Sequence, residues 1–238
     1  MFLGEAKTPD GMRLYAIGDV HGCDALLAEA HGKIAADLAA RPAGDHRIIH
    51  VGDYADRGPD SASVIGRLSA MTAADARVIC LRGNHDQMLI DFLADPEAGA
   101  PLLLANGGKH TLRSYGVTTR GQNYASLGRQ LADLMPAADR AFITGLPLIA
   151  RFGDYLFVHA GIRPGVALAD QRADDLIWIR EEFLHDRRDH GMVIVHGHTP
   201  TDTGAPDVQP NRIDIDTGAV YGGPLTCLVL EGSEVRFL

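Results

Sequence analysis

The sequence predicts an α/β fold that tends towards α+β, and three observations lead to this prediction. Short apolar runs rich in β-branched residues alternate with helical stretches over residues 13–95. After residue 145 the apolar runs follow one another more closely, and residues 96–145 break the alternation with helical spacing. We therefore expect βαβ units in a largely parallel sheet, a second and more antiparallel sheet, and a mainly helical insert over one end of the sheets.

The expected strands are apolar runs that stop at glycine beside polar side chains. They are "RLYAIGD" at 13–19, "RIIHVGD" at 47–53, "RVICLRGN" at 77–84, "YLFVHAG" at 155–161, "MVIVHGH" at 192–198 and "RIDIDTG" at 212–218. A last pair of runs, at 225–232 and 234–238, predicts a closing hairpin.

Helical periodicity marks residues 23–40 and 59–71, where apolar residues recur on one face. Asp60 or Ser61, directly after Pro59, is the expected N-cap of the second helix. Within the insert, residues 106–116 are rich in turn formers, whereas residues 124–143 return to helical spacing. With 46% hydrophobic content over 238 residues, the chain suits one core, so we expect a single domain over 1–238 with the insert at about 96–145.

Charge and cysteine content exclude several classes of partner. The net charge of −9, without a cluster of basic residues, argues against nucleic-acid binding. No apolar run reaches the roughly 18 residues of a membrane span, so no membrane partner is expected. Three cysteines far apart in the sequence are typical of thiols in a reducing compartment, and we expect a cytoplasmic protein.

Each expected strand ends in side chains that bind metals or phosphate. Ligands gather at such strand ends in α/β sheets, and glycine beside them lets the backbone turn so that a short side chain points off the sheet edge. A single aspartate or histidine there is usually a turn former or a structural residue, but five successive ends of this kind indicate a metal site. In order, the candidates are Asp19 and His21, Asp53 with Asp56 and Arg57, Asn84 with His85 and Asp86, His159, and His196 with His198.

Five blocks resemble, in order, the signatures of the metal-dependent phosphoprotein phosphatases, the superfamily of serine/threonine protein phosphatases and their bacterial relatives. They are "GDVHG", "GDYADRG", "RGNHD", "VHAG" and "VHGHT", followed by "IDTGAVYGG" as in bacterial members. The resemblance spans most of the chain, and Ala55 is a minor departure where valine is common. It implies the calcineurin-like metallophosphoesterase fold, in which two mixed sheets pack together between helices in an αββα sandwich, with a mainly helical cap.

The resemblance also implies a role for each matching residue. Asp53 would bridge two metals. The terminal ligands would be Asp19 and His21 on one metal, and Asn84, His159 and His198 on the other. His85 would be the general acid, hydrogen-bonded to Asp56, and Arg57 and Arg180 would hold the phosphate. Arg180 is the looser match, because the second arginine of the family lies in a variable stretch; His196 would be structural.

Oxygen and imidazole donors without thiolate suit two divalent ions, most naturally Mn²⁺, with Fe or Zn as alternatives. Such a pair lowers the pKa of a bridging water, so that the resulting hydroxide attacks phosphorus in line. The arginines then orient the phosphate, and His85 protonates the leaving oxygen.

The expected function is hydrolysis of phosphomonoesters by a serine/threonine protein phosphatase, with phosphotyrosine or small phosphate esters also accepted. The alternative is a diadenosine tetraphosphatase of the same superfamily. Members of that group tend to lack the aspartate at the position of Asp56 and have a longer segment before the last histidine block, whereas here Asp56 is present and 198 − 159 = 39 positions separate the two histidines. A non-catalytic phosphopeptide-binding module would be expected to have lost a ligand or the acid. The natural substrate, the metal and the oligomeric state stay open.

Overall fold

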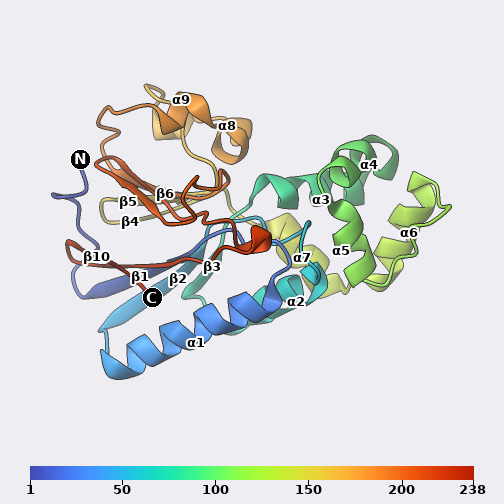
Figure 1. The fold of residues 1–238 in the computed structure, drawn as a ribbon, viewed down its shortest axis with the longest axis horizontal. Coiled ribbons are helices and arrows are strands. Elements are labelled where there is room, and N and C mark those ends of the chain that lie inside the picture. Colours follow the sequence, from blue (N-terminus) through green and yellow to red (C-terminus); the bar gives the residue numbers. More distant parts are fainter.

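Two five-stranded mixed sheets packed face to face form the centre of the computed structural model, which describes residues 1–238 (Figure 1). Helices α1 (Asp24–Ala40) and α2 (Ser61–Ala74) cover the outer face of the first sheet. The short helices α8 (Ala173–Trp178) and α9 (Glu181–Leu184) lie over the second. This confirms the expected sandwich. None of the helices is long and apolar enough to cross a membrane.

The first sheet has the strand order β10-β9-β1-β2-β3. Its strands are β1 (Met12–Ile17), β2 (Asp45–His50), β3 (Val78–Cys80), β9 (Cys227–Glu231) and β10 (Glu234–Phe237). The βαβ units make β1, β2 and β3 parallel, and the closing hairpin adds two antiparallel pairs at the other edge. The predicted parallel units and the hairpin are both present.

The second sheet has the order β4-β5-β6-β8-β7, formed by β4 (Ile149–Phe152), β5 (Tyr155–Val158), β6 (Val193–His196), β7 (Asp207–Gln209) and β8 (Arg212–Asp214). It pairs β5, β6 and β8 in parallel and only its two edges antiparallel. The expectation of a more antiparallel second sheet was therefore wrong, because both sheets hold two pairs of each kind. The edge strands β4 and β7 were not predicted, since both are short and contain half-buried or exposed residues instead of an apolar run.

Alternation along the inner strands builds three hydrophobic cores. Leu14, Ala16 and Ile49 of the first sheet face Phe157 and Val195 of the second, so these side chains form the dry layer between the sheets. Alternate residues of the first sheet face the opposite way and pack against α1 and α2, whereas those of the second sheet pack with α8 and α9. Asp60 is the N-cap of α2, as predicted, and its side chain accepts a hydrogen bond from the Ser63 N–H at 3.0 Å.

Five helices lie beyond one end of the sheets (Figure 1): α3 (Asn84–Ala94), α4 (Pro96–Ala105), α5 (Gly108–Ser114), α6 (Tyr124–Leu134) and α7 (Ala137–Gly145). Residues 106–116 were expected to be turns, but α5 forms there. Gly107 takes the left-handed conformation at φ 98° before the helix, and Thr111 and Leu112 are buried within it. Burial of these two side chains outweighs the turn-forming composition.

A buried ionic cluster ties α1 to the first sheet. The Asp37 carboxylate accepts hydrogen bonds from Tyr15 Oη at 2.7 Å, from both terminal nitrogens of Arg236 at 2.8 and 2.9 Å, and from Arg41. Arg13, also buried, approaches it at 3.2 Å. The hydrogen bonds from Arg236 hold the pKa of Asp37 well below its usual range.

Asp37→Asn should lower the free energy of unfolding by about 3 kcal/mol at pH 7, because it removes the carboxylate that Arg13 and Arg236 share and leaves the buried Arg13 with Glu231 alone. The depressed pKa means that Asp37 contributes fully above about pH 4 and loses its contribution as the pH falls through the folded-state value. Urea unfolding of both proteins from pH 7 to pH 3 checks this. Asp75→Asn, which breaks the exposed pair with Arg77, is the control and should change little. A gap that is independent of pH would contradict the assignment.

Candidate active site

The predicted site residues come together where the strands of both sheets meet the helical insert. Asp19 and His21 follow β1, Asp53 and Asp56 follow β2, and α3 begins at Asn84 and His85 after β3. His159 and His198 follow β5 and β6 in the second sheet. All of these side chains are buried, whereas Arg57 is half-buried and Arg180 is exposed. The two sheets thus contribute from both sides to one polar centre.

The backbone conformation of this centre differs from that of the rest of the chain. Only five residues other than glycine have a positive φ, and all are site residues: His21, Asp53, Asp56, Arg57 and His198. Side chains rarely tolerate this left-handed region, which costs of order 1–3 kcal/mol for each residue. The strain is concentrated where the loops aim side chains at one point, which is typical of functional sites.

Asp86 holds one of these strained loops, a role that the sequence did not predict. Its carboxylate accepts backbone N–H groups of Asp53 and Gly83 at 2.9 Å and of Tyr54 at 3.0 Å. Gly83 passes so close that a Cβ there would lie 2.1 Å from the Asp53 carboxylate. Asp86 therefore fixes the backbone that positions Asp53, and the glycine makes room for the Asp53 side chain.

Asp53 lies at the centre of the site, between two groups of candidate ligands. One group is Asp53 with His21 and His85, and the other is Asp53 with His159 and His198; within each, the ligand atoms lie within 4.8 Å of one another. Asp53 Oδ2 is 3.4 Å from His21 Nε2, and Oδ1 is 3.4 Å from His159 Nε2. One carboxylate thus faces both groups, which is the position expected of a bridging ligand.

Two of the site histidines, His21 and His159, each donate their Nδ1 proton to a backbone carbonyl oxygen. His21 Nδ1 lies 2.8 Å from the Ala55 carbonyl oxygen and His159 Nδ1 lies 3.0 Å from that of Val51, so Nδ1 donates in both rings. Burial lowers the pKa of His159 to about 3 and that of His21 well below its usual range, so both rings are neutral. Each Nε2 therefore presents a lone pair to the site, as a metal-ligating histidine does.

Electron-rich atoms then face one another without a proton between them. His159 Nε2 lies 3.0 Å from Asn84 Oδ1 and 3.4 Å from Asp53 Oδ1, and none of the three atoms carries hydrogen. His198 Nδ1 completes this side at 2.9 Å from Asn84 Oδ1. In a buried site these lone pairs repel one another unless a cation lies between them. The donor set therefore fits divalent metal ions.

Buried carboxylates give a second argument for cations. Burial and then repulsion from Asp216 and Asp53 raise the pKa of Asp19 well above its usual range, and burial raises that of Asp53 to about 6. Asp216, which follows β8, was not among the predicted residues; burial also raises its pKa. Positive charge at the centre would stabilise all three carboxylates in their ionised form.

Two of the predicted residues, Asp19 and His196, lie outside the two groups of ligand atoms. The Asp19 carboxylate accepts the His198 backbone N–H at 3.1 and 3.3 Å, so it braces the loop that follows β6. His196 points away from the centre: its Nδ1 lies 3.1 Å from the Gly197 carbonyl oxygen and its ring packs on Phe183. This position fits the structural role expected of His196.

His85, a member of the first group, also forms a buried pair with Asp56. His85 Nδ1 lies 2.8 Å from Asp56 Oδ2, and His85 Nε2 is buried without a hydrogen-bond partner. The His85 ring meets that of His21 edge to face, with centroids 4.7 Å apart. Burial raises the pKa of Asp56 to about 7 and lowers that of His85. Because Asp56 occupies Nδ1, Nε2 is the atom that can exchange a proton with a substrate.

The two predicted arginines approach the centre from different sheets. Arg57 Nη1 lies 2.9 Å from His21 Nε2, and its guanidinium is 5.8 Å from the centre of the exposed Tyr221 ring. Arg180 donates to Thr199 Oγ1 at 2.9 Å, next to His198. Arg57 is half-buried and Arg180 is exposed, so both can reach a substrate, and both can bind phosphate oxygens through paired N–H groups.

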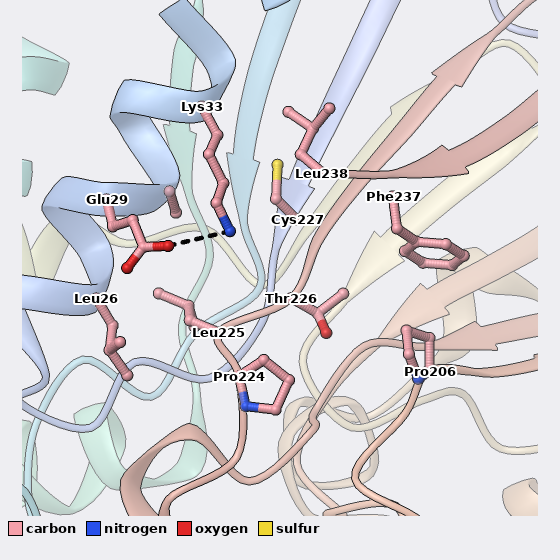
Figure 2. A pocket seen from close by; sticks show the side chains of 11 residues that line it. Leu26, Glu29, Lys33, Pro206, Pro224, Leu225, Thr226, Cys227, Phe237 and Leu238 are labelled. Atoms are coloured by element: carbon pink, nitrogen blue, oxygen red, sulfur yellow. Dashed lines mark ion pairs between the residues drawn. The ribbon is translucent and has the colours of Figure 1, made fainter. Parts of the chain in front are cut away.

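A separate cavity of about 250 Å³ lies between α1 and the C-terminal hairpin (Figure 2). It is largely apolar, and an ion pair between Lys33 and Glu29 spans 3.1 Å at its side. None of the predicted site residues lines it. The cavity is therefore separate from the strand ends where the predicted site residues gather.

Comparison with known proteins agrees with this geometry. The family model of the calcineurin-like phosphoesterases matches residues 12–225. The chain is 30% identical over 228 residues to serine/threonine-protein phosphatase 1 of Salmonella typhimurium, covering 90% of this chain and 89% of that protein. It is 29% identical over 234 residues to the asymmetrical bis(5'-nucleosyl)-tetraphosphatase PrpE of Oceanobacillus iheyensis, covering 90% and 87%. A cold-active protein-tyrosine phosphatase of a Shewanella species shares the fold, with a TM-score of 0.64 and 17% identity over 97% of this chain and 80% of that one.

Asp53→Asn should weaken the binding of both metal ions, because Asp53 is the residue common to the two groups of ligand atoms. The loss should exceed the roughly 10–100-fold that removal of an outer hydrogen-bond partner causes. His159→Asn, which touches one group, should weaken one ion only. Calorimetric titration with Mn²⁺ measures both, and two ions bound with unchanged affinity to Asp53→Asn would refute the bridging position.

Proposed function

This chain belongs to the calcineurin-like phosphoesterase family and is a metallophosphoesterase hydrolase, and on this premise we propose that it is a serine/threonine protein phosphatase. The proposal rests above all on the buried pair of His85 and Asp56 at 2.8 Å. The relative from Salmonella typhimurium, named as a protein phosphatase, supports the same reading.

The metal ligands of the proposal are those predicted from the sequence. Asp19 and His21 would hold one divalent ion and Asp53 both. Asn84, His159 and His198 would hold the second. When bound, the two ions supply a nucleophilic water at neutral pH and offset the charge of the phosphoryl oxygens. Mn²⁺ suits the oxygen and imidazole donors, and Fe and Zn are alternatives.

Arg57 and Arg180 bind and orient the phosphate in this proposal. They lie beside His21 and His198 respectively, so they approach from the two sides of the centre. A guanidinium presents two parallel N–H groups to phosphate oxygens, which fixes the orientation of the ester and stabilises the charge that develops in the transition state. The single pair of arginines suits one phosphoryl group.

His85 gives its Nε2 proton to the leaving oxygen while Asp56 keeps Nδ1–H in place. A serine or threonine alkoxide is a poor leaving group and needs this proton, whereas a nucleotide phosphate leaves readily without it. A buried, braced acid is therefore of most use to an enzyme that cleaves alkyl phosphomonoesters. This argument favours phosphoserine and phosphothreonine over a tetraphosphate substrate.

The second candidate is diadenosine tetraphosphate hydrolysis, which the similarity to the PrpE tetraphosphatase favours. The same metals and arginines would serve that reaction, in which the bond broken is a phosphoanhydride. The two candidates differ in whether the reaction depends on His85.

The substrate class can be decided by kinetics. The protein, dialysed against chelator and refilled with Mn²⁺, should hydrolyse a phosphoserine peptide with a higher kcat/KM than diadenosine tetraphosphate. Steady-state rates for both substrates, with the chelated protein as the inactive control, measure the ratio. The reverse order would make the tetraphosphatase the better assignment.

His85→Asn tests the acid directly. The loss of kcat for the phosphoserine peptide should approach the roughly 10²–10⁴-fold typical of general acid catalysis. The loss of kcat for para-nitrophenyl phosphate should be distinctly smaller, because a nitrophenolate needs little protonation. Metal content is measured alongside, since Asn84 precedes His85. Equal losses on both substrates with the metals retained would show that another group supplies the proton.

A further inference from the structure

Helix α5 of the insert packs directly on the loop that carries Asp56. Thr111 in this helix is fully buried, and its hydroxyl donates to Asp56 Oδ1 at 2.6 Å. Thr111 Oγ1 in turn accepts the Asp56 backbone N–H at 2.8 Å. Three residues later, Ser114 Oγ accepts the Ala62 N–H at 3.0 Å, so α5 is bonded to the loop and to the start of α2.

The two carboxylate oxygens of Asp56 are therefore divided between two partners. Oδ1 receives the Thr111 hydroxyl and Oδ2 faces His85 Nδ1 at 2.8 Å. Asp56 is fully buried and has a φ of 72°, so both its side chain and its strained backbone depend on these contacts. Without the hydroxyl, the orientation of the Asp56 carboxylate plane would no longer be fixed, and Oδ1 would be a buried acceptor without a partner.

We propose that Thr111 is a positioning residue for the general acid, acting through Asp56 on His85. The insert thereby belongs to the proton-transfer machinery of the enzyme as well as covering the sheet ends. The inference rests on the role of His85 proposed above. It assigns to Thr111 a contribution to the departure of the leaving group, which a contact that only stabilises the fold would not make.

Thr111→Val keeps the shape of the side chain and removes the hydroxyl. We expect kcat for a phosphoserine peptide to fall by about tenfold, the scale of a hydrogen bond to a charged group. The loss with para-nitrophenyl phosphate should stay within about threefold, and KM and bound Mn²⁺ should change little. Thr111→Ser retains the hydroxyl and should restore the wild-type ratio. Thr111→Ala repeats the test if the valine variant does not fold.

Tyr115→Phe is the matched control. It removes another buried hydroxyl of the insert, bonded to Asp139 at 3.2 Å and outside the site, and should leave both substrates unaffected. In an Asp56→Asn background Thr111→Val should cause no further loss, because Thr111 acts through that carboxylate. The imidazole proton resonance of His85 should also shift in Thr111→Val and not in Tyr115→Phe.

Equal losses on the two substrates, or the same loss in the Asp56→Asn background, would overturn the positioning role and leave Thr111 a structural residue. If His85→Asn shows its leaving-group dependence while Thr111→Val does not, this inference fails and the proposed function stands. If His85→Asn itself shows none, the acid is wrongly assigned and the role of Thr111 falls with it.

Discussion

The structure of the site depends on one electrostatic constraint: lone pairs and carboxylates are buried together around Asp53. The backbone carbonyls of Val51 and Ala55 direct Nδ1–H of His159 and His21 outwards, which leaves Nε2 of each ring facing the acid. Left alone, these groups repel one another, and burial raises the pKa of Asp53 to about 6. Divalent cations would resolve the conflict, so the same arrangement that is unfavourable in the bare protein fits the site for metal ions.

The surrounding fold supplies the rigidity that such a site needs. Both sheets end at the centre, the dry layer between them keeps those ends in register, and Asp86 locks the loop of Asp53 through three backbone N–H groups. The strain of five left-handed residues is held by this framework. Helix α5 completes it from the other side of the centre, where Thr111 reaches Asp56. In the proposed mechanism, metal binding, phosphate orientation and proton transfer would thus be supported by different elements that share one set of loops.

Sequence reasoning recovered what is local and periodic. It predicted the strand ends, the glycines beside them and the cap at Asp60, because each of these depends on residues that are neighbours in the sequence. It missed β4 and β7, whose register comes from pairing with longer strands, and α5, whose turn-rich composition is overridden by burial of Thr111 and Leu112. The bond between Thr111 and Asp56 joins residues 55 positions apart, and no spacing pattern signals it. Asp86 was visible as a polar residue at a strand end, but its backbone partners were not.

The central claim is that Asp53 lies between two bound cations. Anomalous diffraction from crystals of the protein equilibrated with Mn²⁺ tests it most directly, because the signal locates each ion independently of activity. The account predicts two peaks, one beside His21 and one among Asn84, His159 and His198, with the Asp53 carboxylate between them. A single peak that Asp53 does not contact, or none at these strand ends, would contradict it.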